Sequence, residues 1–260
     1  MLGSIAIEVR RGGTWRWWGP PTFALGWLVT VAAVASPLDS LGESGSLSAH
    51  VAQHVALSDL AAPLLLIGLP PATQALLRRS YERLVAPSAR WRGVSELALS
   101  PMGATVLWAL ATYVWLVPVL HRSAIADGPV HLLDHLSFLA FGLLVWLAAF
   151  DFRTGPPVRD WETLRRALTT CDLPWWARHV YAMGTRLAML PAVAALWLMS
   201  TSAYYLPGQR PPGDMSRHDD QVQAASLMLG FEILLSGLAI VLAFIWVAVS
   251  EGRARQRAGR

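Results

Sequence analysis

The stretch that decides the fold is Ser48–Pro70, SAHVAQHVALSDLAAPLLLIGLP. It begins with two histidines four residues apart, His50 and His54, and then becomes almost wholly apolar. On a helix, residues at this spacing lie about 40° apart on one face and about one turn apart in height, so both imidazoles can point at one object. The stretch therefore predicts a membrane-spanning helix with a histidine pair at one end.

The composition extends this interpretation to the whole chain. The 260 residues are 54% hydrophobic and only 15% charged, and the mean hydropathy of +0.42 excludes an ordinary soluble domain. Apolar runs near the roughly 20 residues needed to cross a bilayer recur along the chain, and helices satisfy their own backbone there. The first run also fits a cleaved signal peptide, but we interpret it as a span. We expect an all-α, polytopic membrane bundle, one transmembrane domain over 1–260, with about six helices at 21–37, 48–69, 97–119, 131–150, 186–206 and 221–250.

The arginines predict the orientation of the bundle. All 21 basic residues are arginine: three precede the first predicted span, five lie between the second and third, six between the fourth and fifth, and four in the tail. The other three, Arg122, Arg210 and Arg217, fall on the opposite side. The positive-inside rule then places both termini in the cytoplasm. We therefore read the net charge of +4 as a sign of orientation and contact with membrane lipids, and expect no nucleic-acid partner. A single cysteine, Cys171, excludes an intrachain disulfide.

A second histidine pair repeats the spacing of the first. His131 and His135 open the fourth predicted span, and Asp134 lies on the same helix face. Neutral imidazole is the commonest metal ligand, and with a carboxylate nearby it suits copper, zinc or iron. The bland alternative is a set of interfacial histidines bonded to loops and lipid headgroups. Six of the seven histidines fall at outer helix ends, which favours a metal site of His50, His54, His131 and His135, with His121, His218 and Asp220 as further candidates.

Two acids lie deep in predicted spans. Asp59 follows His50 by nine residues and points about 180° away from it, and Glu232 lies about 18 Å beyond Asp220 along the last helix. A stripe on that helix, Gln221, Ala225, Met228 and Glu232, predicts a face turned into the bundle or toward a partner. Intramembrane acids are either protonated and hydrogen-bonded within the bundle or part of a proton path.

Together, these motifs resemble the CtaG family of cytochrome c oxidase assembly factors, the multi-span type associated with caa-type oxidases. The resemblance runs from Ser48 to Ser250. It depends on three motifs in order, which are His50-x-x-Gln53-His54 followed by Ala62-Pro63-Leu64-Leu65, His131-x-x-Asp134-His135-Leu136-Ser137-Phe138, and Asp220-Gln221.

The resemblance implies a bacterial inner-membrane protein, not an enzyme, that handles copper on the periplasmic side during maturation of a haem-copper oxidase or another membrane copper enzyme. The motif histidines would be the copper ligands. This chain has Leu116 where the family usually has a histidine, and Leu229 where a tryptophan is common. Two alternatives stay open: a permanently bound accessory subunit of an oxidase or other copper enzyme, and a bis-histidine haem b protein.

Overall fold

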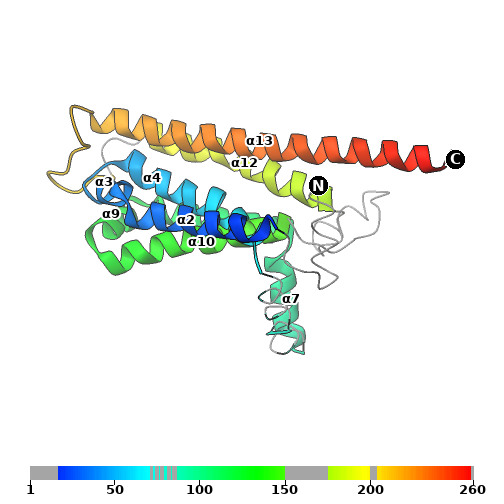
Figure 1. Ribbon diagram of the computed structural model, residues 1–260. Helices are drawn as coiled ribbons and strands as arrows, with labels where there is room; N and C mark the ends of the chain where they lie inside the picture. Colours follow the sequence, from blue (N-terminus) through cyan, green and yellow to red (C-terminus); the bar gives the residue numbers. More distant parts are fainter. Residues whose placement is uncertain are drawn as a thin grey trace.

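The computed structural model describes residues 17–70, 87–149, 175–199 and 204–258, together with a few positions between 71 and 86. Its elements in chain order are α2 (Gly19–Ala35), α3 (Pro37–Glu43), α4 (Leu47–Val55), the π-helical segment η1 (Ala56–Ala61), α5 (Ala62–Ile67), α7 (Ala89–Ala98), α8 (Pro101–Trp115), α9 (Pro118–Ala126), α10 (Gly128–Ala149), α12 (Trp175–Met199) and α13 (Arg217–Ala258). The elements of the described part are all helical, as predicted (Figure 1).

The helices form an elongated bundle (Figure 1). Helices α12 and α13 run side by side, α13 also packs on α4, and α2 packs on η1 and α5. Helix α10 contacts α8, η1, α5 and α12, so it joins the two sides of the bundle. Helix α7 projects away from it, and the C-terminal part of α13 continues past the other helices. The end that holds α3, α9 and the start of α4 carries His50 and His121, whereas His179 lies near the start of α12.

Membrane-crossing capacity is present in several helices. Among the described residues, four helices are long and apolar enough to span a bilayer: Gly19–Glu43 (α2 with α3), Leu47–Ile67 (α4 to α5), α10, and Arg217–Val249 of α13. A fifth span is obtained if the bent pair α8 and α9 counts as one. Exposed apolar side chains such as Leu28 on α2 and Leu234 on α13 suit contact with lipid tails. Six spans and cytoplasmic termini stay predictions.

Several boundaries differ from the predicted ones because serine–proline pairs restart helices. Ser36 caps α3, which occupies the link between the first two predicted spans, and the Ser36 hydroxyl accepts the Leu38 N–H. Ser100 likewise caps α8, so the third span does not begin at residue 97. At the other end of α8, Pro118 starts α9 at 73° to α8. The proline lacks the N–H that a continuous helix would need.

The prediction of a fifth span beginning at Arg186 was wrong. Helix α12 begins at Trp175, and Arg186 lies within it, fully buried. Arg186 therefore does not mark a cytoplasmic boundary, although the remaining arginines keep their strong bias to one side. Most of the predicted cytoplasmic link, with Cys171, falls outside the described residues.

A π-helical segment interrupts the helix that carries the first histidine pair. Such a segment is a wider turn whose backbone bonds are displaced, and it is common at functional sites. Trp146 of α10 donates its indole N–H to the Ser58 carbonyl at 3.0 Å. Gly142 lets α10 approach closely, because a Cβ at this position would lie 2.7 Å from the Ser58 Cα. The segment therefore fixes Asp59 and His54 relative to α10.

Candidate metal centre

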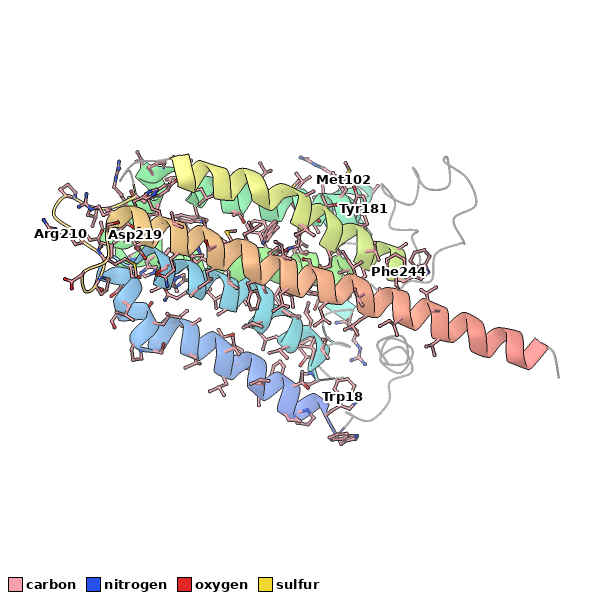
Figure 2. All side chains as sticks on the ribbon, turned by 90° about the horizontal axis from the view of Figure 1, so that it is seen from above. Trp18, Met102, Tyr181, Arg210, Asp219 and Phe244 are labelled. Atoms are coloured by element: carbon pink, nitrogen blue, oxygen red, sulfur yellow. The ribbon has the colours of Figure 1, made fainter. Side chains whose placement is uncertain are left out.

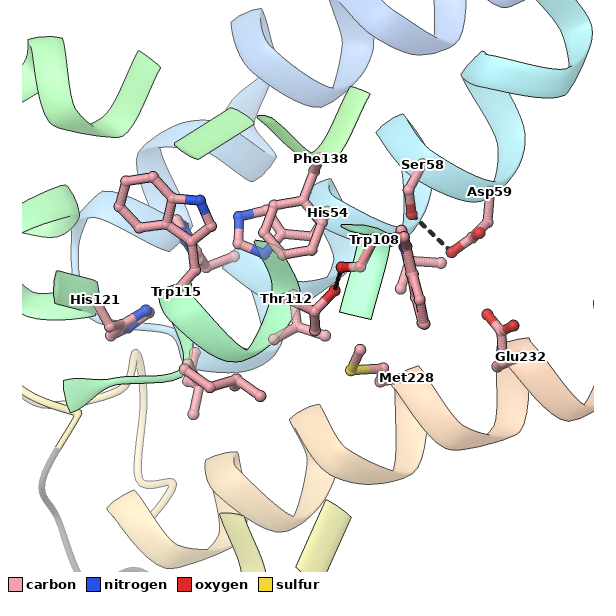
Figure 3. Close-up of a pocket in the computed structure, with 15 residues that line it drawn as sticks. His54, Ser58, Asp59, Trp108, Thr112, Trp115, His121, Phe138, Met228 and Glu232 are labelled. Carbon is pink, nitrogen blue, oxygen red and sulfur yellow. Dashed lines mark hydrogen bonds between the residues drawn. The ribbon is translucent and has the colours of Figure 1, made fainter. Parts of the chain in front are cut away.

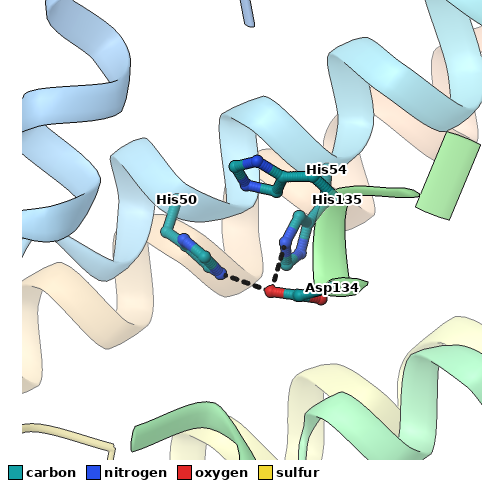
Figure 4. A group of neighbouring side chains, drawn as sticks. All are labelled: His50, His54, Asp134 and His135. Atoms are coloured by element: carbon teal, nitrogen blue, oxygen red, sulfur yellow. Dashed lines mark hydrogen bonds and ion pairs between the residues drawn. The ribbon is translucent and has the colours of Figure 1, made fainter. Parts of the chain in front are cut away.

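Helices α4 and α10 bring the two predicted histidine pairs together. His50 and His54 project from α4 toward His131 and His135 on α10, and Figure 4 shows three of these rings around Asp134. The ring centroid of His50 lies 5.2 Å from that of His131 and 5.5 Å from that of His135. All four residues are buried. The i, i+4 spacing thus does what the sequence predicted, since each helix turns both of its imidazoles toward the other.

Asp134 is the centre of the group. Its Oδ2 lies 3.0 Å from Nε2 of His50 and 3.0 Å from Nε2 of His54, and the carboxylate is almost fully buried. The His54 ring stacks on Phe138 with 3.7 Å between centroids, which fixes its plane. A buried carboxylate facing several neutral imidazoles gives the site one negative charge and several nitrogen lone pairs. That combination favours a cation.

A second ligand group overlaps the first. Ligand atoms of His50, His54, Asp134 and His135 all lie within 4.8 Å of one another, and the same holds for Asp39, His131 and His135. Gln53 of the first motif holds Asp39 in place, because its Nε2 donates to Asp39 Oδ1 at 2.7 Å and to the Ala33 carbonyl at 2.8 Å. Sequence reasoning missed Asp39, since its segment was predicted as a loop.

The outer side of this second group is open to solvent. The Glu43 side chain is 54% exposed, and its Oε1 lies 3.5 Å from His131 Nδ1. Going inward from Glu43, His131 lies beside His135, which belongs to both ligand groups, and His50 belongs to the inner group. The two ligand groups are therefore adjacent.

The interatomic distances suit a metal ion. A tetrahedral ion with bonds of about 2.0 Å holds its ligand atoms about 3.3 Å apart. The Nε2 atoms of His131 and His135 lie 3.2 Å apart, close to that value. His50 Nδ1 and Asp134 Oδ1 are buried and find no hydrogen-bond partner among the described residues. Buried acceptors of this kind are unusual in a site that serves packing alone.

The remaining predicted ligands have different positions. His121 is buried, and the bend between α8 and α9 brings its ring within 5.1 Å of the His50 ring. His218 is exposed at the start of α13 and is not brought to the group. We call His50, His54, His121, His131 and His135 the histidine cluster.

Asp220 caps a helix instead of facing the cluster. Its carboxylate accepts the backbone N–H groups of Leu47 and Ser48 at 2.6 and 3.1 Å and the Ser48 hydroxyl at 2.6 Å. The Tyr205 hydroxyl donates to it at 2.9 Å, and burial together with this carboxylate raises the pKa of Tyr205. Asp220 therefore sets the start of α4 and the height of His50.

A cavity leads from the cluster into the bundle (Figure 3). Its volume is about 30 Å³. His54 and His121 line one part of it, and Asp59 and Glu232 line the other, with Met228 between them. The predicted inward face of the last helix is confirmed, because Gln221, Ala225 and Glu232 are buried.

The two deep acids meet an arginine that the sequence interpretation had placed outside the membrane. Arg186 Nη2 donates to Asp59 Oδ1 and, at 2.8 Å, to Glu232 Oε2. Its Cζ lies 4.4 Å from the centroid of the Trp108 ring. We call Asp59, Arg186 and Glu232 the ion triad. A signal for it was available, since two acids deep in apolar helices require a cation and Arg186 is flanked by apolar residues.

Comparison with known proteins adds one finding. Residues 3–250 match the model of a family described as cytochrome c oxidase caa3 assembly factor. The match covers almost the whole chain and includes every residue of the histidine cluster. Comparisons with curated proteins and with solved structures gave no match.

Proposed function

Because the chain belongs to the family of cytochrome c oxidase caa3 assembly factors, we propose that it binds a copper ion in the histidine cluster and transfers it to an oxidase subunit during assembly. The observation that carries this proposal is the convergence of three buried imidazoles, those of His50, His54 and His135, on Asp134. Imidazole and carboxylate donors suit copper, zinc and iron alike, and the family favours copper among them.

Two overlapping ligand groups support transfer as well as storage. The group of Asp39, His131 and His135 lies beside exposed Glu43, whereas the group of His50, His54, Asp134 and His135 is buried. His135 belongs to both, so an ion can exchange ligands one at a time without losing all its bonds. We propose that copper enters and leaves through the outer group and rests in the inner group.

The direction of delivery follows from the predicted topology. Arg210 and Trp18 lie at opposite ends of the bundle (Figure 2), and His50 and His121 line one pocket with Gln209, the residue before Arg210. The positive-inside distribution assigns the loop end to the periplasm. We therefore propose a periplasmic copper site in a bacterial inner membrane, with an oxidase subunit or another membrane copper enzyme as the recipient.

Metal analysis of the purified full-length protein tests the proposal. After incubation with copper and removal of excess ion, we expect copper bound by the wild-type protein and lost in the variant His50→Gln/His54→Gln. Glutamine keeps an N–H donor for Asp134 but is a poor metal ligand, so the fold should survive. The matched control is His218→Gln, a histidine at the same end that lies outside the cluster. Equal copper content in all three proteins would reject the site.

The two alternatives predict other results. A permanently bound accessory subunit would co-purify with an oxidase, and its effect on the oxidase would survive loss of the histidines. A haem b protein would show a Soret band. The haem alternative is disfavoured by space, because the cavity beside the cluster has a volume of about 30 Å³, far below the several hundred Å³ of a cofactor pocket.

A further inference from the structure

The ion triad contains two acids and one arginine, so its charges do not balance if both acids are ionised. Arg186 is completely buried and always carries its proton, so it balances one carboxylate. If Asp59 and Glu232 were both ionised, the centre of the bundle would hold an uncompensated negative charge in a medium of low dielectric constant, which is strongly unfavourable. A single bound proton makes the triad neutral.

The hydroxyl groups near the two acids favour Glu232 as the acid that binds this proton. The groups facing Glu232 are Arg186 from α12, Asp59 from η1 and Ser236 on its own helix. The Ser236 hydroxyl donates to Glu232 Oε1 at 2.9 Å, and the Met183 sulfur, 3.9 Å from its oxygen, is a second acceptor within its reach. When this hydroxyl donates to the sulfur, its oxygen can accept a hydrogen bond from a protonated Glu232.

The hydrogen bonds to Asp59 favour its ionised carboxylate. Its Oδ1 accepts from Arg186, and its Oδ2 accepts from the Ser58 hydroxyl at 2.8 Å. The Ser58 hydroxyl has no second acceptor among the described residues, so it stays on Asp59, and hydrogen bonds to both carboxylate oxygens stabilise the ionised form.

Water has a place beside the triad. The cavity lined by Asp59 and Glu232 has a volume of about 30 Å³, enough for about two water molecules. The indole N–H of Trp108, which also lines it, is buried and has no acceptor within the described part of the chain. An unpaired buried donor beside a cavity that two carboxyl groups also line is a position where ordered water is expected. The same cavity reaches His54 and His121.

We propose that Glu232 is an exchangeable proton site and that the cavity connects it with the histidine cluster. In the release step the O–H bond of Glu232 breaks, the proton passes to cavity water, and the carboxylate that remains pairs with Arg186. A coupling to copper follows, and this part rests on the proposed function: a cation in the cluster disfavours the proton at Glu232, so each ion bound expels one proton from the triad.

Infrared spectroscopy of metal-free protein tests the proton site. We expect the wild-type protein to show a protonated-carboxyl C=O band that shifts in D2O, and Glu232→Gln to lack it. Because Glu232→Gln alters a partner of the buried Arg186, Ser236→Ala gives a second test that leaves folding intact: both acids remain, and the band should stay but change frequency. Glu43→Gln is the control with an unchanged band. Absence of any such band near neutral pH, or its persistence in Glu232→Gln, would overturn the proposal.

Proton counting tests the coupling separately. Copper is added to weakly buffered protein, and the protons released are measured with a pH-sensitive dye. We expect Glu232→Gln to bind copper and to release about one proton fewer per ion than wild type. Equal release in both proteins would overturn the coupling. If the infrared band is found but no copper binds, the proposed function fails while the proton site stands.

Discussion

The histidine cluster and the ion triad differ in how their buried polar groups are paired. Both place polar side chains inside an apolar bundle, and both depend on the helix that runs from His50 to Asp59. In the cluster and the adjoining Asp134, two buried atoms, His50 Nδ1 and Asp134 Oδ1, have no hydrogen-bond partner in the part of the chain that the structure describes. In the triad, Arg186 donates to both acids, and the atoms without a partner among the described residues are its donors Nε and Nη1. The cluster is therefore suited to receive a cation, whereas the triad contains its own.

The comparison predicts its largest effect at Arg186. The change Arg186→Met leaves a buried carboxylate unpaired, and breaking a buried pair in this way costs about 3 to 5 kcal/mol. We expect a large fall in the unfolding temperature of the protein in detergent. The triple variant Asp59→Asn/Arg186→Met/Glu232→Gln removes all three charges and should recover most of the loss. Near wild-type stability of Arg186→Met alone would show that the triad is not a structural requirement.

Gly142 tests the connection between the two regions. The change Gly142→Ala adds a methyl group 2.7 Å from the Ser58 Cα, and overpacking of this kind costs about 1 to 3 kcal/mol. Since Ser58 lies between His54 and Asp59, we expect weaker copper binding together with the loss of stability. Gly230→Ala is the matched control, because nothing lies within 4 Å of the added methyl group on α13. Equal behaviour of the two variants would mean that close packing on η1 does not set the geometry of the cluster.

Asp220 separates stability from binding. The change Asp220→Ala removes the carboxylate that caps α4, and we expect a loss of about 1 kcal/mol of stability. Copper content at saturation should match wild type, because Asp220 belongs to neither ligand group. Parallel measurement of unfolding and metal content checks both parts. Loss of copper without loss of stability would make Asp220 a ligand after all, as its sequence position suggested.

The sequence predicted most of the cluster and little of the triad, for a physical reason. Two residues four apart on a helix share a face whatever the tertiary structure, so His50 with His54 and His131 with His135 could be paired before any coordinates. Residues two apart on a helix diverge by about 200°, which is why His218 and Asp220 have such different environments. The direction of His121 depends on a 73° bend that local patterns do not encode.

Arg186 shows that counting arginines alone can misplace a residue relative to the membrane. The positive-inside rule treats each arginine as a surface marker, and it gives the correct interpretation only when the side chain reaches the headgroups. An arginine paired with two acids from other helices violates that condition. Recognising it requires matching charges over long sequence separations, here from residue 59 to 186 and 232.

The smallest effect is expected at the entrance of the site. Glu43 is largely exposed and lies beside His131, so it should attract copper to the outer group without contributing much to final affinity. We expect Glu43→Gln to slow copper uptake by about two- to fivefold at low salt and to leave copper content at saturation unchanged, because attraction by an exposed charge is screened by salt. Stopped-flow measurement of uptake at low and high salt checks this, with the exposed loop acid Asp214→Asn as the matched control. If uptake by Glu43→Gln is as fast as wild type at low salt, the ion reaches the buried histidines by a route that bypasses Asp39 and His131, and the distinction between an open outer group and a closed inner one loses its functional meaning.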